Sequence, residues 1–244
     1  RFAVLIAARN EESCIAGLIE SLRAQHYPPE LVDIWVLPNN CTDRTAEAAR
    51  RAGAQVLEMP ASVRSKGAAL HTAAKALLRS TRNYDAFCVF DADNEADPAF
   101  LSEMNRALDR TAIVKSRILA KNRTQAGISA CYEIYFCSAN NFLNRAREAM
   151  GLSARVIGTG FAIRRDLLET LDGFPCRTLT EDAELYAACL CRGARIGYCE
   201  TAVTYDEEPV TWRASLVQRR RWMSGILQVA RLTLPELVRN FLCQ

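Results

Sequence analysis

Two carboxylates separated by a single residue are the strongest candidate for metal binding in this sequence. Asp91 and Asp93 follow the apolar run of residues 86–90, and both could bear on one hard cation or on its water shell. A bound nucleotide diphosphate would need such a cation. The alternative is a solvated acidic turn in which Asn94 helps by hydrogen bonding. The position of the pair directly after a buried strand favours the metal site.

A second acidic pair, Glu181 and Asp182, follows Thr180 and precedes a segment that predicts a helix over residues 182–192. An ordinary N-terminal cap explains this pair, because Thr180 can cap the helix and acidic residues favour the positive end of the helix dipole. A carboxylate held there would also remain ionised at neutral pH. Asp182 could then accept a proton from a sugar hydroxyl within hydrogen-bond reach.

Residues 211–232 predict a helix with two different faces. At about 100° per residue, Gln218, Arg221 and Trp222 share one side, which offers an amide, a guanidinium for phosphate and an indole for a sugar ring. A solvated basic face or a contact with anionic lipids would explain the arginines equally well. The opposite side is apolar, and either core packing or membrane contact accounts for it. Its residues are Trp212, Leu216, Met223, Ile226, Leu227 and Ala230.

Alternating strands and helices must position these side chains. Apolar runs at residues 2–7, 32–37, 55–59 and 86–90 predict strands, and a helix is expected after each of the first three. Three successive strand–helix units imply a parallel sheet. The acids that follow residue 90 then lie at the carboxyl edge of the sheet, where open α/β sheets bind their ligands.

The second half of the sequence is less regular. We expect helices over residues 98–110 and 126–150 and near Leu167, and a strand through Val114. Residues 155–163 predict a strand around Gly158, Thr159 and Gly160, although a bulge or turn that needs small residues is an equal interpretation.

Two prolines mark the end of the chain. Pro209 closes a strand region, and Pro235 begins a short last helix after the one that ends at residue 232. No linker rich in Gly, Ser or Pro interrupts the sequence, which favours one domain.

The composition is that of an ordinary globular protein, with 50% hydrophobic and 24% charged residues. The net charge of +3 is too small to argue for a nucleic-acid partner. Ten scattered cysteines without a CxxC unit, and only two histidines, favour reduced thiols over a zinc site or a disulfide framework. No stretch approaches the ~18 apolar residues of a membrane-spanning helix. Because the chain starts without Met inside an apolar run, we expect it to be a piece of a longer protein.

Three motifs, taken in order, resemble those of the family-two glycosyltransferases: Asp-x-Asp after a buried strand, Thr-Glu-Asp, and Gln-x-x-Arg-Trp on a late helix. The sequence resembles in particular the membrane-embedded β-glycan synthases, which include cellulose, chitin, hyaluronan and poly-N-acetylglucosamine synthases. The likeness covers nearly the whole chain and includes residues 8–11, 40–43 and 66–67.

The resemblance implies a single GT-A-type domain with a Rossmann-like α/β fold. Its central sheet would be mostly parallel and flanked by helices, with an amphipathic interface helix at the C-terminus. Residues 1–208 would form the catalytic part, and residues 209–244 would form the amphipathic helices that close the site.

The same resemblance implies roles for the matching residues in donor binding. Glu11 and Asn39 would border the base and ribose, with Lys66 near the nucleotide. Asp91 would face the ribose or the metal, and Asp93 would bind Mg²⁺ or Mn²⁺ at the diphosphate. Gln218 and Arg221 would steady that diphosphate.

Catalysis and acceptor binding are implied for the remaining matches. Asp182 corresponds to the general base that deprotonates the acceptor hydroxyl for in-line attack at the anomeric carbon, which inverts its configuration. Trp222 would form part of the acceptor site, together with Gly158, Thr159 and Glu181.

Two positions depart from the family pattern. Family members usually have Asp where this chain has Asn39, and an amide oxygen can still accept a hydrogen bond from a base, but without charge. The sequence therefore specifies the identity of the nucleotide base less well than it specifies the fold. Ala7 replaces the usual proline near the first loop, which should soften that turn without changing its chemistry.

We therefore expect the catalytic domain of an inverting glycosyltransferase that uses a UDP-sugar and a saccharide acceptor, in polysaccharide synthesis at the cytoplasmic face of the cell membrane. Two alternatives remain open. A sugar-nucleotidylyltransferase would want a glycine-rich loop after the first strand, which residues 8–11 lack. A catalytically silent module that only binds nucleotide sugars would not need Asp93, Asp182 and Arg221 together.

Overall fold

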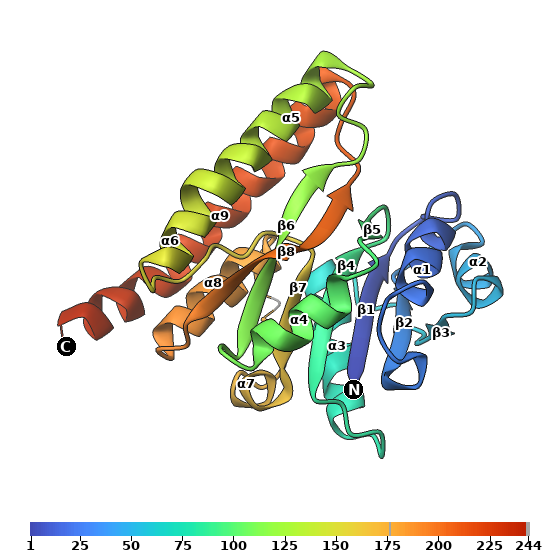
Figure 1. Cartoon of the computed structure of the whole chain (residues 1–244), viewed down its shortest axis with the longest axis horizontal. Coiled ribbons are helices and arrows are strands. Elements are labelled where there is room, and N and C mark those ends of the chain that lie inside the picture. Colours follow the sequence, from blue (N-terminus) through green and yellow to red (C-terminus); the bar gives the residue numbers. More distant parts are fainter. Residues whose placement is uncertain (176, 243–244) are drawn as a thin grey trace.

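The computed structural model describes residues 1–175 and 177–242, and in this part of the chain eight strands form one sheet (Figure 1). Their order across the sheet is β3-β2-β1-β4-β7-β6-β8-β5. The strands are β1 (Phe2–Ala8), β2 (Val32–Pro38), β3 (Gln55–Val56), β4 (Ala86–Asp91), β5 (Glu95–Ala96), β6 (Ile113–Ala120), β7 (Phe161–Arg164) and β8 (Ile196–Asp206).

The predicted parallel half is confirmed. Strand β1 pairs in parallel with both β2 and β4, and β2 pairs in parallel with β3. Helices α1 (Ile15–Arg23), α2 (Thr45–Arg51) and α3 (Lys66–Leu78) connect these strands, with a short 3₁₀ turn, η1 (Pro29–Leu31), before β2. All four strands therefore end at one edge, as the sequence predicts. Strand β3 is shorter than the predicted 55–59.

Side-chain alternation along the strands produces a core on each face of the sheet. In β1, Val4 and Ile6 point into one core, while Ala3 and Leu5 point into the other, and all four are fully buried. The first core is covered by α1 and α4 (Phe100–Leu108). The second is covered by α3, α7 (Arg165–Thr170) and α8 (Glu181–Cys191).

The second half of the sheet is mixed. Strand β7 runs antiparallel to both neighbours, β4 and β6, whereas β6 and β8 are parallel, with a register shift between Ser116 and Arg117. The predicted strand over residues 155–163 is wrong in extent, because the strand begins at Phe161. The preceding glycines form a turn instead, because Gly158 and Gly160 both have positive φ. The Gly158 carbonyl accepts a hydrogen bond from Lys66. The Gly160 carbonyl accepts hydrogen bonds from Lys115 and from the Ser116 amide of β6.

Two long helical segments form an arm that projects from the sheet, and they lie side by side in Figure 1. The first is continuous, with α5 (Gly127–Ser138), a π-helical segment η2 (Ala139–Asn144) and α6 (Arg145–Ala149). The second is α9 (Trp212–Leu242). The predicted break before Pro235 is wrong, because that proline lies inside one continuous helix.

The arm contains the longest helix of the fold. Within the part of the chain that the structure describes, no helix is both long enough and apolar enough to cross a lipid bilayer. The predicted division at residues 208–209 falls between β8 and α9, and it stays a prediction.

Gly160 leads to a prediction about stability. A Cβ at this position would lie 2.5 Å from Ser116 Oγ and 2.8 Å from Thr204 Oγ1, and its φ is +61°. We expect Gly160→Ala to lower the free energy of unfolding by about 1–3 kcal/mol more than Gly193→Ala does. Gly193 is the matched control, because its φ is +68° but nothing lies within 4 Å of its Cβ position. Urea unfolding of both variants measures the difference, and equal losses would contradict the close approach.

Candidate active site

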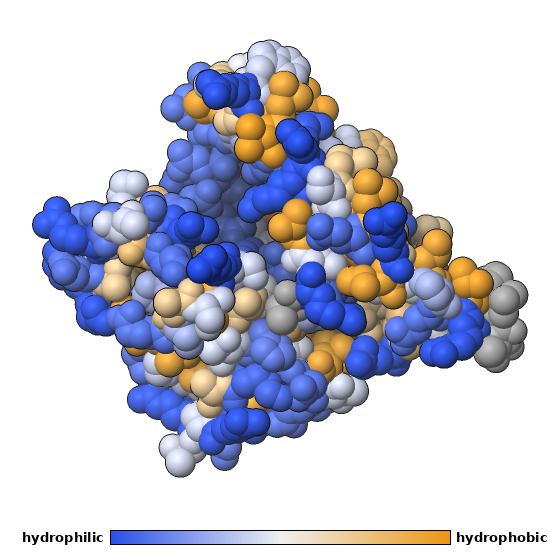
Figure 2. Space-filling model, turned by 180° about the vertical axis from the view of Figure 1, so that it is seen from behind, coloured by the Kyte–Doolittle hydropathy of each residue, from blue (hydrophilic) through white to orange (hydrophobic). Residues whose placement is uncertain are grey.

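The turn formed by Gly158, Thr159 and Gly160 lies at the centre of the candidate site. It contacts residues at the carboxyl end of β4 and at the N-termini of α3 and α8. Gly158 is therefore held by α3 and α8, whereas Thr159 is held by β4. Figure 2 shows a hollow lined by hydrophilic side chains between the arm and the part that carries α1 and α2.

Lys66, the first residue of α3, joins several of the predicted site residues. Its ammonium lies 2.6 Å from an Asp91 carboxylate oxygen and 3.2 Å from a Glu181 oxygen, and it donates a 2.6 Å hydrogen bond to the Gly158 carbonyl. Burial opposes the charge of this lysine, but the two carboxylates outweigh it and raise the pKa of Lys66. The lysine is therefore a fixed cation, placed between the metal-site acid and the acid pair of α8.

Asp182 lies in the first turn of α8, and its Oδ2 accepts a 2.7 Å hydrogen bond from the Gly158 amide. Glu184, which is 1% exposed, holds the preceding loop: its carboxylate accepts hydrogen bonds from the amides of Arg177 and Thr178 and pairs with the Arg177 guanidinium at 2.9 Å. These contacts orient the start of the helix, so the predicted base carboxylate faces the glycine turn.

Helix α9 fixes the same loop from the other side. A Cβ on Gly225 would lie 2.4 Å from Thr180 Cγ2, so only glycine allows this approach. Three residues further along, Gln228 accepts a 3.0 Å hydrogen bond from the Leu179 amide. The late helix therefore contacts the Thr-Glu-Asp motif and its preceding residue through packing at Gly225 and a hydrogen bond at Gln228.

The two acids predicted to bind a metal lie at the carboxyl end of β4: Asp91 is its last residue, and Asp93 lies two residues beyond. The Asp91 amide donates 3.0 Å hydrogen bonds to Asn94 Oδ1 and to Thr159 Oγ1, and the Thr159 hydroxyl also contacts Asn94. Asn94 donates in turn to Asp93 Oδ1 at 3.2 Å. Asn94 therefore ties both acids to the glycine turn.

The donor set at Asp91 and Asp93 fits a hard divalent cation. Burial and the neighbouring charge of Asp91 raise the pKa of Asp93 to about 7, so a cation would relieve this crowding. Within residues 1–175 and 177–242, no cluster of three acidic, histidine or cysteine side chains is placed to hold a metal. Two carboxylates, with the remaining ligands from phosphates and water, are the usual way in which Mg²⁺ binds at such sites.

The loops after β1 and β2 form the predicted nucleotide side. Glu11 accepts a 3.1 Å hydrogen bond from the Cys14 thiol, and its charge adds to the crowding at Asp93. Asn39 is 5% exposed, and its amide oxygen already accepts a 2.8 Å hydrogen bond from Asn40. Any base that this oxygen also bound would share it with Asn40.

The predicted residues of α9 are divided between two environments. Gln218 accepts a 2.8 Å hydrogen bond from the Tyr132 hydroxyl, and Trp222 packs edge-on against the same ring, 6.2 Å between centroids. Trp222 also joins a small core with Ile157, next to the glycine turn. Arg221 is exposed and shares an open groove with Gln218 at the start of α9. The structure therefore brings Trp222 behind the turn and leaves Arg221 at the surface.

The apolar stripe of α9 is exposed, with Trp212 at 71%, Leu216 at 61% and Leu227 at 63%. The core-packing explanation of this stripe is therefore wrong in the structure. The contacts of α9 come instead from its other side, through Ser215, Gln218, Trp222 and Gly225.

Three charged residues of the site were not predicted from the sequence. Lys115 is 1% exposed on β6, and Asp206 and Glu208 lie at the end of β8 and just beyond it. Burial raises the pKa of Asp206 to about 7 and that of Glu208 to about 8, with nearby acids contributing to both. A lysine directly after Val114 in the predicted strand, and three consecutive acids before Pro209, were the available signals.

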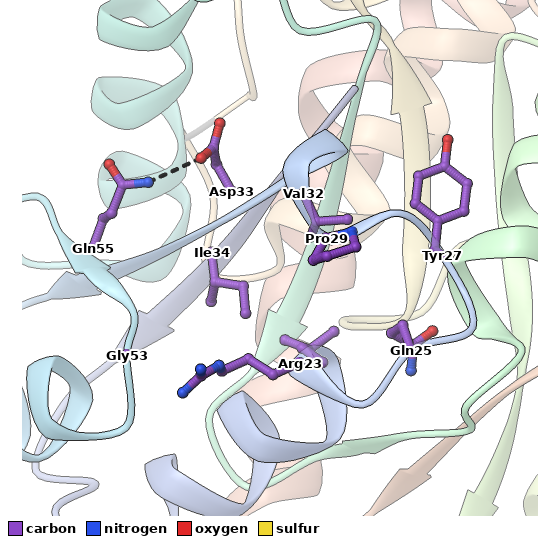
Figure 3. Close-up of a pocket in the computed structure, with 10 residues that line it drawn as sticks. Arg23, Gln25, Tyr27, Pro29, Val32, Asp33, Ile34, Gly53 and Gln55 are labelled. Atoms are coloured by element: carbon purple, nitrogen blue, oxygen red, sulfur yellow. Dashed lines mark hydrogen bonds between the residues drawn. The ribbon is translucent and has the colours of Figure 1, made fainter.

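A separate pocket, shown in Figure 3, opens near the start of β2 and has a volume of about 330 Å³. It lies at the amino ends of the parallel strands, away from the glycine turn. Its polar side chains already bind within the protein. Arg23 donates to the Ala52 carbonyl, Gln25 bonds the Asp97 carbonyl and the Leu101 amide, and Gln55 donates to Asp33. This pocket therefore offers few unpaired polar groups to a ligand, unlike the carboxyl edge.

Comparison with known proteins agrees with this geometry. Residues 1–225 match the family described as Glycosyltransferase like family 2. The chain is 27% identical over 237 residues to the probable glycosyltransferase YdaM of Bacillus subtilis, covering 92% of this chain and 55% of that protein. It is 26% identical over 233 residues to the β-monoglucosyldiacylglycerol synthase of Synechocystis, covering 91% of this chain and 47% of that protein. The chain thus spans about half the length of these relatives.

A solved structure with the same fold is the mannosyltransferase PcManGT of Pyrobaculum calidifontis, in complex with GDP-Man and Mn²⁺. It superimposes with a TM-score of 0.75 at 20% identity, covering 96% of this chain and 64% of that chain. The predicted GT-A-type α/β fold is confirmed by this likeness.

Glu208 predicts a measurable pH dependence of stability. In the folded state the Glu208 carboxyl has a pKa of about 8, whereas in the unfolded chain its pKa is the ordinary 4.5. The folded state therefore binds more protons between these values, and the free energy of unfolding should fall as the pH rises from 4.5 to 8. We expect Glu208→Gln to flatten the fall in Tm between pH 5 and 7, in protein without added divalent cations. Above pH 7 the buried Lys115, whose pKa burial lowers to about 7, acts in the opposite direction.

Glu207→Gln is the control for this measurement, since Glu207 is an exposed neighbour. Thermal unfolding across the pH range compares the two variants with the unaltered chain. A Tm profile of Glu208→Gln that has the original slope would show that Glu208 does not titrate as described.

Proposed function

The chain belongs to the glycosyltransferase like family 2, and from this premise we propose that it moves a sugar from a nucleotide diphosphate donor to an acceptor hydroxyl, with inversion at the anomeric carbon. The observation that carries the proposal is the placement of Asp182 and Asp91 against the same glycine turn. The proposed base and a proposed metal ligand would then act at one edge of the sheet. The family match favours this reaction over nucleotidylyl transfer.

The residues of the site divide the chemistry between them. Asp182 is placed to accept the proton of the acceptor hydroxyl as that oxygen attacks the anomeric carbon. Asp91 and Asp93 would hold Mg²⁺ or Mn²⁺, and a bound cation would stabilise the negative charge of the leaving diphosphate. Arg221, which lines an exposed groove of α9, would add a guanidinium contact to the same diphosphate.

We propose a UDP-sugar as donor and a saccharide as acceptor, in polysaccharide synthesis. A lipid is a second candidate acceptor, which a specific observation favours: the apolar stripe of α9 is exposed beside the groove that contains Gln218 and Arg221. One relative, the Synechocystis enzyme, is named as a synthase of a glucosyldiacylglycerol. Release of nucleoside diphosphate from UDP-glucose, UDP-N-acetylglucosamine or GDP-mannose, with cellobiose or with diacylglycerol vesicles, separates these cases.

We further propose that the protein acts at the cytoplasmic face of the cell membrane and that α9 lies against the lipid surface. Apolar and basic side chains alternate on its exposed side, where Arg213, Arg220 and Arg231 are all exposed beside the apolar stripe. Figure 2 shows hydrophobic side chains gathered along the arm among strongly hydrophilic ones. Such a surface suits an interface with anionic headgroups.

Two amide substitutions test the division of roles. Asp182→Asn should lower kcat by about 10²–10⁴-fold while nucleotide binding persists, because only proton removal is lost. Asp93→Asn should instead weaken binding of UDP with Mn²⁺ by about 10–100-fold. Turnover assays and calorimetric titration measure the two effects. Asp85→Asn is the control, since Asp85 is an exposed acid at the start of β4, away from this edge. Near-normal turnover of Asp182→Asn would remove the base assignment.

The surface of α9 predicts lipid binding. We expect Leu216→Glu combined with Leu227→Glu to weaken binding to phosphatidylglycerol vesicles by about tenfold or more, because each change removes exposed apolar surface and adds a repelled charge. Sedimentation with vesicles gives the bound fraction. Thr81→Glu combined with Asn83→Glu adds the same charge in an exposed loop before β4. Equal binding of both double variants would exclude the α9 surface as the lipid contact.

A further inference from the structure

A buried lysine that the reaction described above does not use lies beneath the glycine turn. Lys115 is on β6, and its ammonium donates hydrogen bonds to the Thr159 carbonyl at 2.8 Å, the Gly160 carbonyl at 3.2 Å and Ser116 Oγ at 3.2 Å. All three donors of the ammonium thus have an acceptor, and each acceptor is a neutral oxygen.

Each carbonyl group of the turn accepts a hydrogen bond from a lysine side chain. Lys66 binds the carbonyl of Gly158, and Lys115 binds the carbonyls of the two following residues. Backbone hydrogen bonds anchor the end of the turn, from the Gly160 amide to the Val89 carbonyl at 2.8 Å and from the Ser116 amide to the Gly160 carbonyl at 2.9 Å. Glycine at two of its three positions gives the rest of the turn conformational freedom, which the lysine contacts at Gly158 and Thr159 restrict. The lysines therefore help to fix the direction of the Gly158 amide.

We propose that Lys115 is a positioning residue for the transfer reaction, and that it acts through the Gly158–Gly160 turn to hold the base Asp182 in its productive orientation. This inference rests on the proposed function, because it assumes that Asp182 removes the acceptor proton. In the described part of the chain, the hydrogen bond that the structure shows for the Asp182 carboxylate comes from the Gly158 amide. A turn that shifts would release this carboxylate.

Donor binding should depend on Lys115 much less. The Asp91 amide bonds to Asn94 Oδ1 as well as to Thr159, so the metal-site acids keep an anchor of their own when the turn moves. Lys66 also keeps its ion pairs with Asp91 and Glu181. If Lys115 positions the base, its substitution should lower kcat and leave the affinity for nucleotide nearly unchanged. A general loss of structure would lower both.

Burying a lysine among neutral oxygens is unfavourable for its charge, and burial lowers the pKa of Lys115 to about 7. The carboxylates of Asp206, Asp182 and Asp91 act in the opposite direction and favour its protonated form. A hydrophobic side chain at this point of β6 would avoid the cost of burial. The chain has instead a lysine whose hydrogen bonds go to two carbonyl groups of the turn and to the adjacent Ser116 hydroxyl.

The test compares Lys115→Arg, Lys115→Gln and Lys115→Met in the whole chain, with the donor and acceptor that the release assay selects. We expect kcat to fall in the order Lys, Arg, Gln, Met, and by roughly 10–100-fold in Met, because small displacements of catalytic groups have effects of this size. The Kd of UDP with Mn²⁺ should change little across the series. Ile113→Ala, a buried substitution two residues earlier on β6, is the control for lost stability.

The result that would overturn the inference is a kcat that is unchanged in the series, or one that falls only as far as that of Ile113→Ala at equal Tm. Parallel loss of kcat and UDP affinity would also overturn it. If Lys115→Met does not fold, the comparison between Arg and Gln decides, because both retain donors but only Arg retains the charge. Asp182→Asn is measured beside them: normal turnover there refutes the proposed base, whereas an inactive Asp182→Asn with a fully active Lys115→Gln refutes only the role of Lys115.

Discussion

The candidate site depends on how closely the backbone at Gly160 approaches β6 and β8. Ser116 Oγ and Thr204 Oγ1 occupy the space that a Cβ would need, so the turn is held against the sheet and does not extend β7. This approach presents the Gly158 amide to Asp182 and the Thr159 hydroxyl to the Asp91 amide. Groups from β4, β6, α3 and α8 therefore meet at three consecutive residues, and a displaced turn would disturb all of them.

The charges around the turn explain why two lysines are present. Burial raises the pKa values of Asp93, Asp206 and Glu208, and the acids at this edge raise them further because their charges repel one another. Lys66 offsets part of that charge directly, through its ion pairs. Lys115 is bound to carbonyl groups and adds a positive field beneath the turn. The remaining excess of negative charge suits a site that receives a divalent cation together with a diphosphate.

Much of this site was predictable because one rule of sheet geometry places it. The carboxyl ends of parallel strands meet at one edge, which positions Asp91 and the loops of Glu11 and Asn39 from hydrophobic patterning alone. Lys115 was not predicted, because a lysine in a strand is ordinarily assigned to the solvent face. Its partners are backbone carbonyl groups, which the hydrophobic pattern does not reveal. The role of Gly225 depends on helix packing against Thr180, which no local pattern specifies. The unbroken α9 shows that packing overrides the local preference of Pro235.

Helix α9 connects the chemistry to the exposed surface of the arm. On its inner side, Ser215, Gln218 and Trp222 contact Tyr132. Further along the same side, Gly225 and Gln228 contact the loop that precedes α8, at Thr180 and Leu179. Its outer side carries the exposed apolar stripe. The same helix therefore carries the packing contact with Thr180 on one side and the exposed apolar stripe on the other. These two surfaces are parts of one rigid element of secondary structure, because the backbone hydrogen bonds of an α-helix are made within the helix.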